Sequence, residues 1–496
     1  MNAAHNTSLS PCGATIALDL GTTSIKAGIL NQQGELQGIV TAAAAPITGE
    51  NGRYESDALE YLKIAERVLR DCLTQTNSAN AVLGICSQRS SFLIWEKISG
   101  QPVTPLISWQ DNRGAPSCEA LQESNNLIHA LTGLRLTPYY FAPKVSAMLN
   151  APQGDNENLR TRLKRGELLL GTLDTFLIWH WTQGRHYITD ASMAARTLLM
   201  DIQRQQWSPE LCLLFNIPPR ILPQIKPSVA LNLPLKIADI NHGLILQASV
   251  ADQSAALIAT LSPCGALDQD NAEALINLGT GGFVIRYLHG TAAQNIASVK
   301  PNGYLTTLVY QDENQRAYTA CEGTLNSIAA ALAPYHVNEC ALEKDVALNE
   351  IFCLAEPSGM GAPYFCADIG LTFSQSTAHL TDKQVATLLL EAIIFRVARI
   401  VEDFHHHAPL KRVYLSGGLS EIKCLQQGIA QCLPCDVYRL DQKEASLYGA
   451  ALLASGSALL SDKHSKKITA HSDTYHLLEK YQRWKIWLND LLESHR

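Results

Sequence analysis

The sequence lacks the two features that would point to a membrane or to a nucleic acid. No stretch of its 496 residues approaches the roughly 20 uncharged apolar residues that a membrane-spanning helix requires. Basic residues are not in excess, because 39 Lys and Arg stand against 46 Asp and Glu and leave a net charge of −7. Affinity for nucleic acid depends on clustered cations. We therefore expect small-molecule partners, with neither nucleic acid nor membrane among them.

A secretion signal and a disulfide framework are also missing. Residues 1–14 have no long apolar core of the kind that a signal peptide carries. The 13 cysteines are odd in number and scattered through apolar segments. These features favour reduced thiols and a cytoplasmic protein. The length exceeds what one compact core usually holds and predicts two or three domains.

Two stretches share one layout, an apolar strand, a Gly-Thr turn and a second apolar strand. They are ALDLGTTSIKAGIL, from Ala17 to Leu30, and ALINLGTGGFVIRYL, from Ala274 to Leu288. Gly21 and Gly279 lie 258 residues apart, about the size of one domain, so we predict two related halves. Strand-like runs alternate with amphipathic helical segments, which predicts a mixed α/β fold. These helical segments run from Ala58 to Gln75, Lys383 to Phe404 and Tyr475 to Leu492.

The Gly-Thr turns have the chemistry of a phosphate site. Glycine lets backbone N–H groups approach an anion closely, and threonine adds hydroxyl donors. Asp19, at the end of the first strand, suits Mg²⁺ held through water. The glycines of a third stretch, LSGG (Leu415–Gly418), precede a helical pattern, where an anion is favoured. Each turn by itself is explained as well by an ordinary tight turn, whereas together they indicate a nucleotide cleft.

Ordered motifs along residues 15–457 resemble the FGGY carbohydrate kinases, and within that family the glycerol kinases most. The motifs are DLGTT, SQRSSFLIWEKISGQPV, SWQDNR, TGLRLTPYY, GTLDTFLIW, VADQSAAL, INLGTGGF, GMGAPYF and LSGG. The resemblance implies a two-domain actin-like (ribonuclease H-like) ATPase fold with a catalytic cleft between the domains. It also implies ATP and Mg²⁺ as cofactors, a small polyol or sugar as substrate, and a homodimer as a plausible assembly.

The resemblance also assigns roles to residues. Asp252 matches the general base, which a hydroxyl needs as it attacks the γ-phosphoryl group; without the family it would be read as a helix N-cap. The positions that match substrate contacts are Arg89, Ser90, Trp109, Tyr139, Asp252, Gln253 and Phe283. The positions that match nucleotide contacts are Gly21, Thr22, Thr23, Lys26, Gly279, Thr280, Gly417 and Gly418, with Asp19 for the metal. By composition alone, Trp109 and Phe283 would be core residues and Arg89 a surface charge.

Domain boundaries follow from the motifs and from a turn-rich segment, residues 259–274. We predict an N-terminal kinase domain over 13–258, a C-terminal kinase domain over 272–457 and a helical tail over 458–496. The tail helix is expected to pack onto the body rather than to bind a partner.

The chain departs from the glycerol kinase pattern at several positions. Ser90 stands where glycerol kinases carry a glutamate that accepts hydrogen bonds from glycerol. An ionised acceptor of this kind is worth roughly 1.5–3 kcal/mol, so its loss weakens glycerol binding or makes room for a larger substrate. Other departures are Lys26 in place of arginine, Ala147, Ala329, Ala333, Ile422 and a shortened signature around CADIGLTFSQ.

Three hypotheses for function follow. The first is an ATP-dependent kinase that phosphorylates a hydroxyl of glycerol or a related polyol or sugar. The second keeps the chemistry but changes the substrate to a ketose or sugar acid, such as xylulose, ribulose or gluconate. The third is a catalytically impaired, actin-like regulatory protein that binds ATP. Ser90 motivates the second, and the departures Ala329, Ala333 and Ile422 motivate the third.

Overall fold

The computed structural model describes most of the chain. The described residues are 13–150, 156–261, 272–288, 302–340, 349–441, 444–456, 465–470 and 475–495. They group into two compact units, and each is described by itself. The first unit comprises Met1–Ala259, Thr307–Tyr318 and Glu444–Leu460, and the second comprises Thr260–Thr306, Thr319–Lys443 and Ser461–Arg496.

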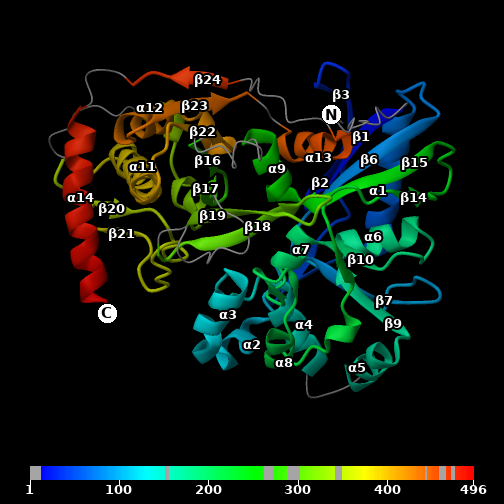
Figure 1. Ribbon diagram of the computed structural model, residues 1–496. Helices are drawn as coiled ribbons and strands as arrows, with labels where there is room; N and C mark the ends of the chain where they lie inside the picture. The colour runs from blue at the N-terminus through cyan, green and yellow to red at the C-terminus, as the bar shows by residue number, and fades with distance from the viewer. Residues whose placement is uncertain are drawn as a thin grey trace, which may run out of the picture. The chain divides into compact units, whose positions relative to one another are not determined.

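The first unit is built on a six-stranded sheet with the order β14-β15-β6-β1-β2-β3 (Figure 1). Its strands are β1 (Ala14–Leu20), β2 (Ser24–Leu30), β3 (Leu36–Ala43), β6 (Asn80–Ser87), β14 (Leu233–Leu235) and β15 (Gly243–Ala251). β1 and β2 are antiparallel and join at the Gly-Thr turn, so the predicted first hairpin is confirmed. β6 runs parallel to β1, and β15 runs parallel to β6. Asp19, near the end of β1, and Asp252, directly after β15, therefore stand at the carboxyl ends of the two parallel strands that flank β6.

Helices pack on this sheet through apolar faces. α1 (Ala58–Leu73) begins after Asp57, whose carboxylate accepts hydrogen bonds from two backbone N–H groups of the first turn. Leu62, Ala65 and Leu69 recur at helical spacing and are buried. α13 (Ala445–Ser455) packs against β1, β6 and β15. It also approaches α9 (Asp252–Thr260), the helix that begins with the predicted base.

A second, five-stranded sheet of the first unit has the order β4-β5-β8-β7-β9. These strands are β4 (Thr48–Glu50), β5 (Arg53–Ser56), β7 (Phe92–Glu96), β8 (Leu106–Ile107) and β9 (Leu168–Thr172). The remaining elements of this unit are α2 (Ala115–Ala120), α3 (Asn125–Thr132), α4 (Phe141–Asn150), α5 (Asn156–Arg165), α6 (Leu173–Trp181), α7 (Ala191–Ala195), α8 (Pro209–Leu214), β10 (Ile188–Asp190), β11 (Met200–Asp201), β12 (Gln206–Trp207) and β13 (Gln224–Lys226).

The second unit carries a seven-stranded sheet with the order β18-β19-β17-β16-β22-β23-β24. Its strands are β16 (Glu273–Leu278), β17 (Gly282–Tyr287), β18 (Leu305–Gln311), β19 (Ala317–Leu325), β22 (Arg412–Ser416), β23 (Asp436–Leu440) and β24 (Ser465–Ile468). The tip of the β18–β19 hairpin, Thr307–Tyr318, groups with the first unit. β16 and β17 are antiparallel, which confirms the second predicted hairpin.

The two large sheets repeat one topology. The order β3-β2-β1-β6-β15 in the first corresponds to β19-β17-β16-β22-β23 in the second, with the same alternation of antiparallel and parallel pairs. The internal duplication that the two Gly-Thr hairpins predicted is thus confirmed at the level of strand order.

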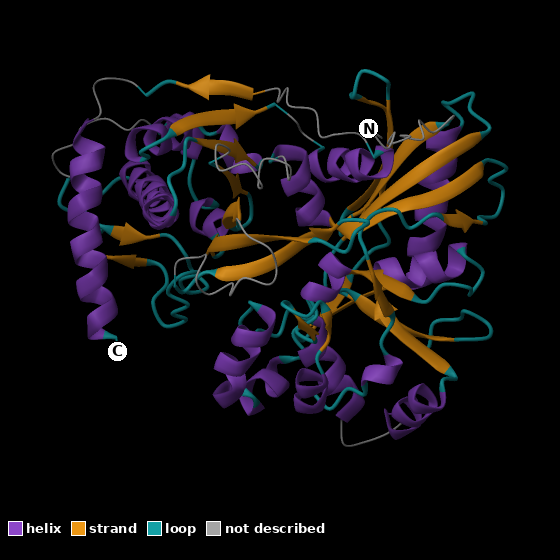
Figure 2. Cartoon of the chain, viewed as in Figure 1, coloured by secondary structure: helices purple, strands orange, loops and turns teal. Residues whose placement is uncertain are grey.

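The helices of the second unit are drawn in purple in Figure 2. They are α10 (Ile328–Leu332), α11 (Asp382–His407), α12 (Lys423–Cys432) and α14 (Tyr475–Ser494), and the short strands β20 (Cys353–Leu354) and β21 (Thr372–Phe373) lie in the same unit. α11 starts with a capping box between Thr381 and Gln384. The helix expected directly after the LSGG turn begins later, because a 3₁₀ turn over Gly418–Glu421 and an extended Ile422 precede α12.

The C-terminal segment packs onto the second unit, as predicted for its helix. Leu477, Tyr481 and Trp484 of α14 are buried. Ahead of this helix, β24 pairs with β23 and extends the seven-stranded sheet, so the segment contributes a strand as well as a helix. Among the described helices, none combines the length and apolar character needed to cross a bilayer.

The approach of α13 to its neighbours depends on glycine. A Cβ at Gly449 would stand 1.9 Å from the carbonyl oxygen of Ala255 in α9, so replacing this glycine by alanine must separate the two helices. We expect Gly449→Ala to lower the free energy of unfolding by about 1–3 kcal/mol, as overpacking commonly does, measured by urea denaturation. The control is Gly418→Ala, where nothing lies within 4 Å of the added methyl group. Equal midpoints for the two variants would contradict the prediction.

Candidate active site

Asp19 lies on β1 just before the Gly-Thr turn. It pairs in register with Lys26 of β2 and with Cys86 of β6. Removal from water and, to a smaller extent, the nearby Asp252 carboxylate raise the pKa of Asp19 to about 7, although the Cys86 thiol and the Lys26 ammonium oppose the shift. Asp19 and Asp252, predicted from motifs more than 200 residues apart, are therefore within electrostatic reach of each other.

Asp252 is the first residue of α9 and directly follows β15. One carboxylate oxygen, Oδ1, lies 3.5 Å from Nε of Arg89 and accepts a hydrogen bond of 2.7 Å from the backbone N–H of Gln253. The side chain keeps 31% of its exposure. Desolvation raises the pKa of Asp252, whereas the guanidinium groups of Arg89 and Arg196 lower it. Asp252 thus bonds a backbone N–H in the first turn of α9 and still presents its carboxylate to solvent.

Ser90 is buried, with a positive φ of 63°. Its hydroxyl donates to the backbone carbonyl of Arg196 at 3.1 Å. The guanidinium of Arg196 is also buried, donates to the hydroxyl of Thr307 at 3.4 Å and stands 5.7 Å from the ring centre of Tyr140. Position 90 therefore offers the site a small hydroxyl, engaged with backbone, where the glycerol kinase pattern has a carboxylate.

The indole of Trp109 connects the substrate side to the Gly-Thr turn. Its Nε1–H donates to the hydroxyl of Thr22 at 3.0 Å, and the indole is 38% exposed. Thr22 in turn donates to the side-chain carbonyl of Gln88 at 3.3 Å, and the Gln88 amide donates to the carbonyl of Gly21. Predicted phosphate and substrate residues thus share one hydrogen-bond network within the first unit.

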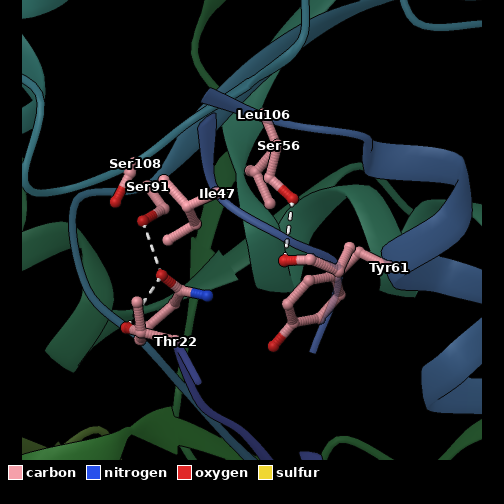
Figure 3. Close-up of a pocket in the computed structure, with 9 residues that line it drawn as sticks. Thr22, Ile47, Ser56, Tyr61, Ser91, Leu106 and Ser108 are labelled. Atoms are coloured by element: carbon pink, nitrogen blue, oxygen red, sulfur yellow. Dashed lines mark hydrogen bonds between the residues drawn. The ribbon is translucent and has the colours of Figure 1, made fainter. Parts of the chain in front are cut away.

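A small cavity lies behind this network (Figure 3). Its walls include Thr22, Ser91 and Ser108, and Figure 3 shows Tyr61 on the other side. It has room for about one water molecule, so it is too small to hold a sugar. We expect the substrate on the exposed side of Trp109. Tyr139, the other aromatic residue predicted to contact substrate in this unit, is 54% exposed.

Lys26 forms an ion pair as well as facing Asp19. Its Nζ lies 2.6 Å from Oε2 of Glu444, the residue before α13. An ammonium group has three N–H donors, so this contact leaves others for a phosphate. Thr23 is exposed at the tip of the hairpin, and Gly21 accepts a hydrogen bond from the hydroxyl of Tyr61 at 2.8 Å.

A buried network holds the start of α9 from behind. Asp190 caps α7 by accepting from the backbone of Ser192 and Met193, and the hydroxyl of Ser228 also donates to it. Ser192 then accepts a hydrogen bond of 2.8 Å from the N–H of Ala251, the residue before Asp252. Burial raises the pKa of Asp190 to about 7. Sequence reasoning missed Asp190, although an aspartate directly before a helix is a favoured N-cap.

The predicted residues of the second unit also meet one another. Gly279 and Thr280 form the tip of the β16–β17 hairpin, and the carbonyl of Thr280 accepts from the N–H of Ala329. Gly417 has a positive φ of 87°, and a Cβ there would stand 2.4 Å from the carbonyl oxygen of Leu278, next to Gly279. The LSGG turn and the Gly-Thr turn of this unit are therefore adjacent, and only glycine allows the approach. Phe283 follows on β17 and is half-buried.

The donor set for a divalent metal is small. Among the residues that the structure describes, no three His, Cys, Asp or Glu side chains converge as ligands. Asp19 nevertheless supplies the single carboxylate that Mg²⁺ commonly takes from a protein when water and phosphate oxygens complete its shell. The chemistry of Asp19 therefore fits a Mg²⁺ ion that arrives with a nucleotide.

Comparison with known proteins identifies the family to which the chain belongs. A model of the FGGY family of carbohydrate kinases matches the chain in two parts, its N-terminal domain over residues 14–258 and its C-terminal domain over residues 274–458. The chain belongs to the FGGY family of carbohydrate kinases. The fold is accordingly the two-domain actin-like fold, and the protein is a kinase of carbohydrates or polyols.

The relatives that this FGGY kinase resembles differ in the substrates they are named for. An apulose kinase of Pectobacterium atrosepticum is 32% identical, and the alignment covers 95% of this chain and 96% of the relative. A glycerol kinase of Nitrosomonas eutropha is 32% identical, with 88% of each chain covered. A crystal structure of Plasmodium falciparum glycerol kinase with ADP superposes with a TM-score of 0.79 at 21% identity, covering 96% of this chain and 98% of that one. Membership of a kinase family implies ATP as the phosphoryl donor.

The partly desolvated Asp19 predicts a dependence of stability on pH. Because its pKa is about 7 in the folded state against an ordinary value of 3.8, its contribution to stability is complete below about pH 4 and is lost as the pH rises through 7. We expect Asp19→Asn to escape this loss. Without Mg²⁺ or nucleotide, the free energy of unfolding of the variant, measured by urea denaturation, should exceed that of wild type by about 1–2 kcal/mol at pH 8. This advantage should disappear near pH 4. A variant less stable than wild type at pH 8 would contradict it.

Proposed function

We propose that this FGGY kinase transfers the γ-phosphoryl group of ATP to a hydroxyl of a small sugar or polyol, with Asp252 as the general base. The observation that supports this most is the placement of Asp252 at the carboxyl end of β15, still 31% exposed, beside Arg89 and within electrostatic reach of Asp19. In open α/β sheets, ligands bind outside the carboxyl ends of the strands. A carboxylate presented there can reach a substrate hydroxyl.

The proton balance follows from the contacts of Asp252. A carboxylate oxygen takes the hydroxyl proton, the alkoxide oxygen forms a bond to the γ-phosphorus, and the bond between that phosphorus and ADP breaks. Arg89 and Arg196 favour the ionised carboxylate, while desolvation favours the protonated one. Desolvation is the larger effect, so the pKa of Asp252 lies above its usual value, which suits a carboxylate that accepts the hydroxyl proton.

Asp19 is the residue that would hold Mg²⁺. When bound, the ion would neutralise charge on the nucleotide phosphates. The Gly-Thr turn beside Asp19 contributes backbone N–H groups, the hydroxyl groups of Thr22 and Thr23, and the ammonium of Lys26. In the second unit, the adjacent glycine turns at Gly279 and Gly417 are the proposed nucleotide contacts.

Position 90 bears on the choice of substrate. A glycerol kinase carries a glutamate acceptor there, whereas Ser90 uses its hydroxyl to bond the carbonyl of Arg196. The carboxylate that would bind two hydroxyls of a three-carbon polyol is thus missing at this position. We propose a sugar larger than glycerol, a ketose such as apulose being the first to test, and a sugar acid the alternative because two guanidinium groups, Arg89 and Arg196, face Asp252.

A phosphorylation assay over a substrate panel tests this choice. Glycerol, apulose, xylulose, ribulose and gluconate would each be supplied with ATP and Mg²⁺, and ADP release measured. We expect a ketose to exceed glycerol in kcat/KM by about tenfold or more, since one charged hydrogen bond is worth about that much. Efficient turnover of glycerol alone would contradict the argument from Ser90.

Replacing the proposed base tests the mechanism. Asp252→Asn keeps the size of the side chain but cannot take a proton, so kcat with the preferred substrate should fall by about 10²–10⁴-fold. The matched control is Asp239→Asn, a change of the same kind at an 81% exposed side chain, which should leave kcat unchanged. Activity of Asp252→Asn within a factor of ten of wild type would remove Asp252 from the mechanism.

A further inference from the structure

Lys144 is a fully buried lysine that bonds two backbone carbonyls. It lies on α4 with 0% exposure, and its Nζ donates to the carbonyl oxygens of Ser90 and of Ser108, each at 2.9 Å. The ammonium also stands 5.8 Å from the ring centre of Phe92. Neither of these two hydrogen bonds goes to a carboxylate, so this lysine acts on the backbone of two segments rather than as half of an ion pair.

Each of these two segments carries residues of the proposed substrate site. The first, after β6, holds Arg89 and Ser90, and the second, after β8, holds Ser108 and Trp109. A further bond of 3.0 Å joins the N–H of Trp109 to the hydroxyl of Ser91. In Figure 3, Ser91 and Ser108 lie on the same wall of the small cavity. The spacing between the Arg89 and Trp109 side chains therefore depends on how these two backbones are held together.

Burying a lysine at this position costs desolvation free energy, which argues for a role beyond packing. Burial lowers the pKa of Lys144 to about 7, the Asp111 carboxylate opposes this shift, and the Arg113 guanidinium adds to it. A neutral amine still has two N–H groups, one for each carbonyl. The pair of bonds can thus persist across the neutral pH range. An apolar side chain of equal volume would avoid the cost of desolvation but would leave both carbonyls without this donor.

We propose that Lys144 is a positioning residue for the sugar: by bonding the carbonyls of Ser90 and Ser108, it sets the separation of Arg89 from Trp109. This inference rests on the proposed substrate site and extends it, because Lys144 itself touches no substrate. It places the larger effect on sugar binding. Lys144 bonds the carbonyls of Ser90 and Ser108 and neither Lys26 nor the turn glycines, and the link from its segments to the phosphate turn is the side-chain bond from Trp109 to Thr22.

The test compares variants by their separate KM values. Lys144→Met keeps the length and volume but removes both donors, and Lys144→Arg keeps donors. The control is Lys480→Met, since Lys480 is 1% exposed, equally buried, but pairs with Glu391 in the second unit. With the best substrate of the panel, we expect Lys144→Met to raise KM for the sugar by about tenfold or more, because small misplacements of binding groups cost on the order of 10²-fold. KM for ATP should stay within a factor of two to three.

The outcomes separate this inference from the proposed function. Lys144→Arg should recover part of the lost sugar affinity, and Lys480→Met should lower the unfolding midpoint without changing KM for the sugar. A folded Lys144→Met enzyme with wild-type KM for the sugar overturns the inference. If Lys144→Met does not fold, Lys144→Arg decides, because the longer, planar guanidinium cannot bond both carbonyls at the separation that the lysine amine sets. A wild-type KM for the sugar then overturns the proposal, and a raised one with unchanged KM for ATP supports it. Absence of kinase activity in the wild type would instead refute the proposed function.

Discussion

The site depends on keeping two carboxylates, Asp19 and Asp252, partly out of water and close enough that the charge of Asp252 raises the pKa of Asp19. Desolvation and mutual repulsion both disfavour the charged pair, so folding stability alone would not select it. Arg89, Arg196 and Lys26 offset part of this cost. A phosphate-bound cation would offset more of it, and for that reason such a pair is poised for a charged ligand.

The surrounding scaffold is rigid where the carboxylates need to be fixed. Gly449 allows α13 to lie directly against α9, and Ser192 bonds the N–H of the residue before Asp252. Lys144 plays a comparable part on the substrate side, where it bonds backbone carbonyls of two separate segments. In each case a backbone group, and not the tip of a side chain, is held. Backbone restraints of this kind limit how far a catalytic group can drift, and a displacement of about 1 Å can cost on the order of 10²-fold in rate.

Local patterns in the sequence were enough to predict the fold. The two Gly-Thr hairpins were visible because each strand is an apolar run broken at a turn, and their repetition predicted the duplicated strand order. Contacts between distant segments left no such pattern. Lys26 and Glu444 are 418 positions apart, and the bond from Ser90 to Arg196 spans 106. Spacing within a helix or strand says nothing about such pairs, so Arg196, Asp190 and Lys144 were not predicted. A lysine within the largely apolar run of α4 was the one available signal.

The position that sets this chain apart from glycerol kinases illustrates how selectivity can change while a fold persists. Ser90 has a positive φ, and its hydroxyl donates to the carbonyl of Arg196. The backbone next to Arg89 is therefore held without a carboxylate at position 90. The loss therefore falls on a ligand contact and not on the fold. A substrate with more hydroxyl groups can compensate for that missing contact by bonding other polar groups of the proposed substrate site. Glycerol has few other hydroxyl groups to offer. Selectivity between glycerol and a larger sugar then depends on how many polar groups of the site each one leaves without a hydrogen-bond partner. Buried polar sites discriminate most strongly on this basis.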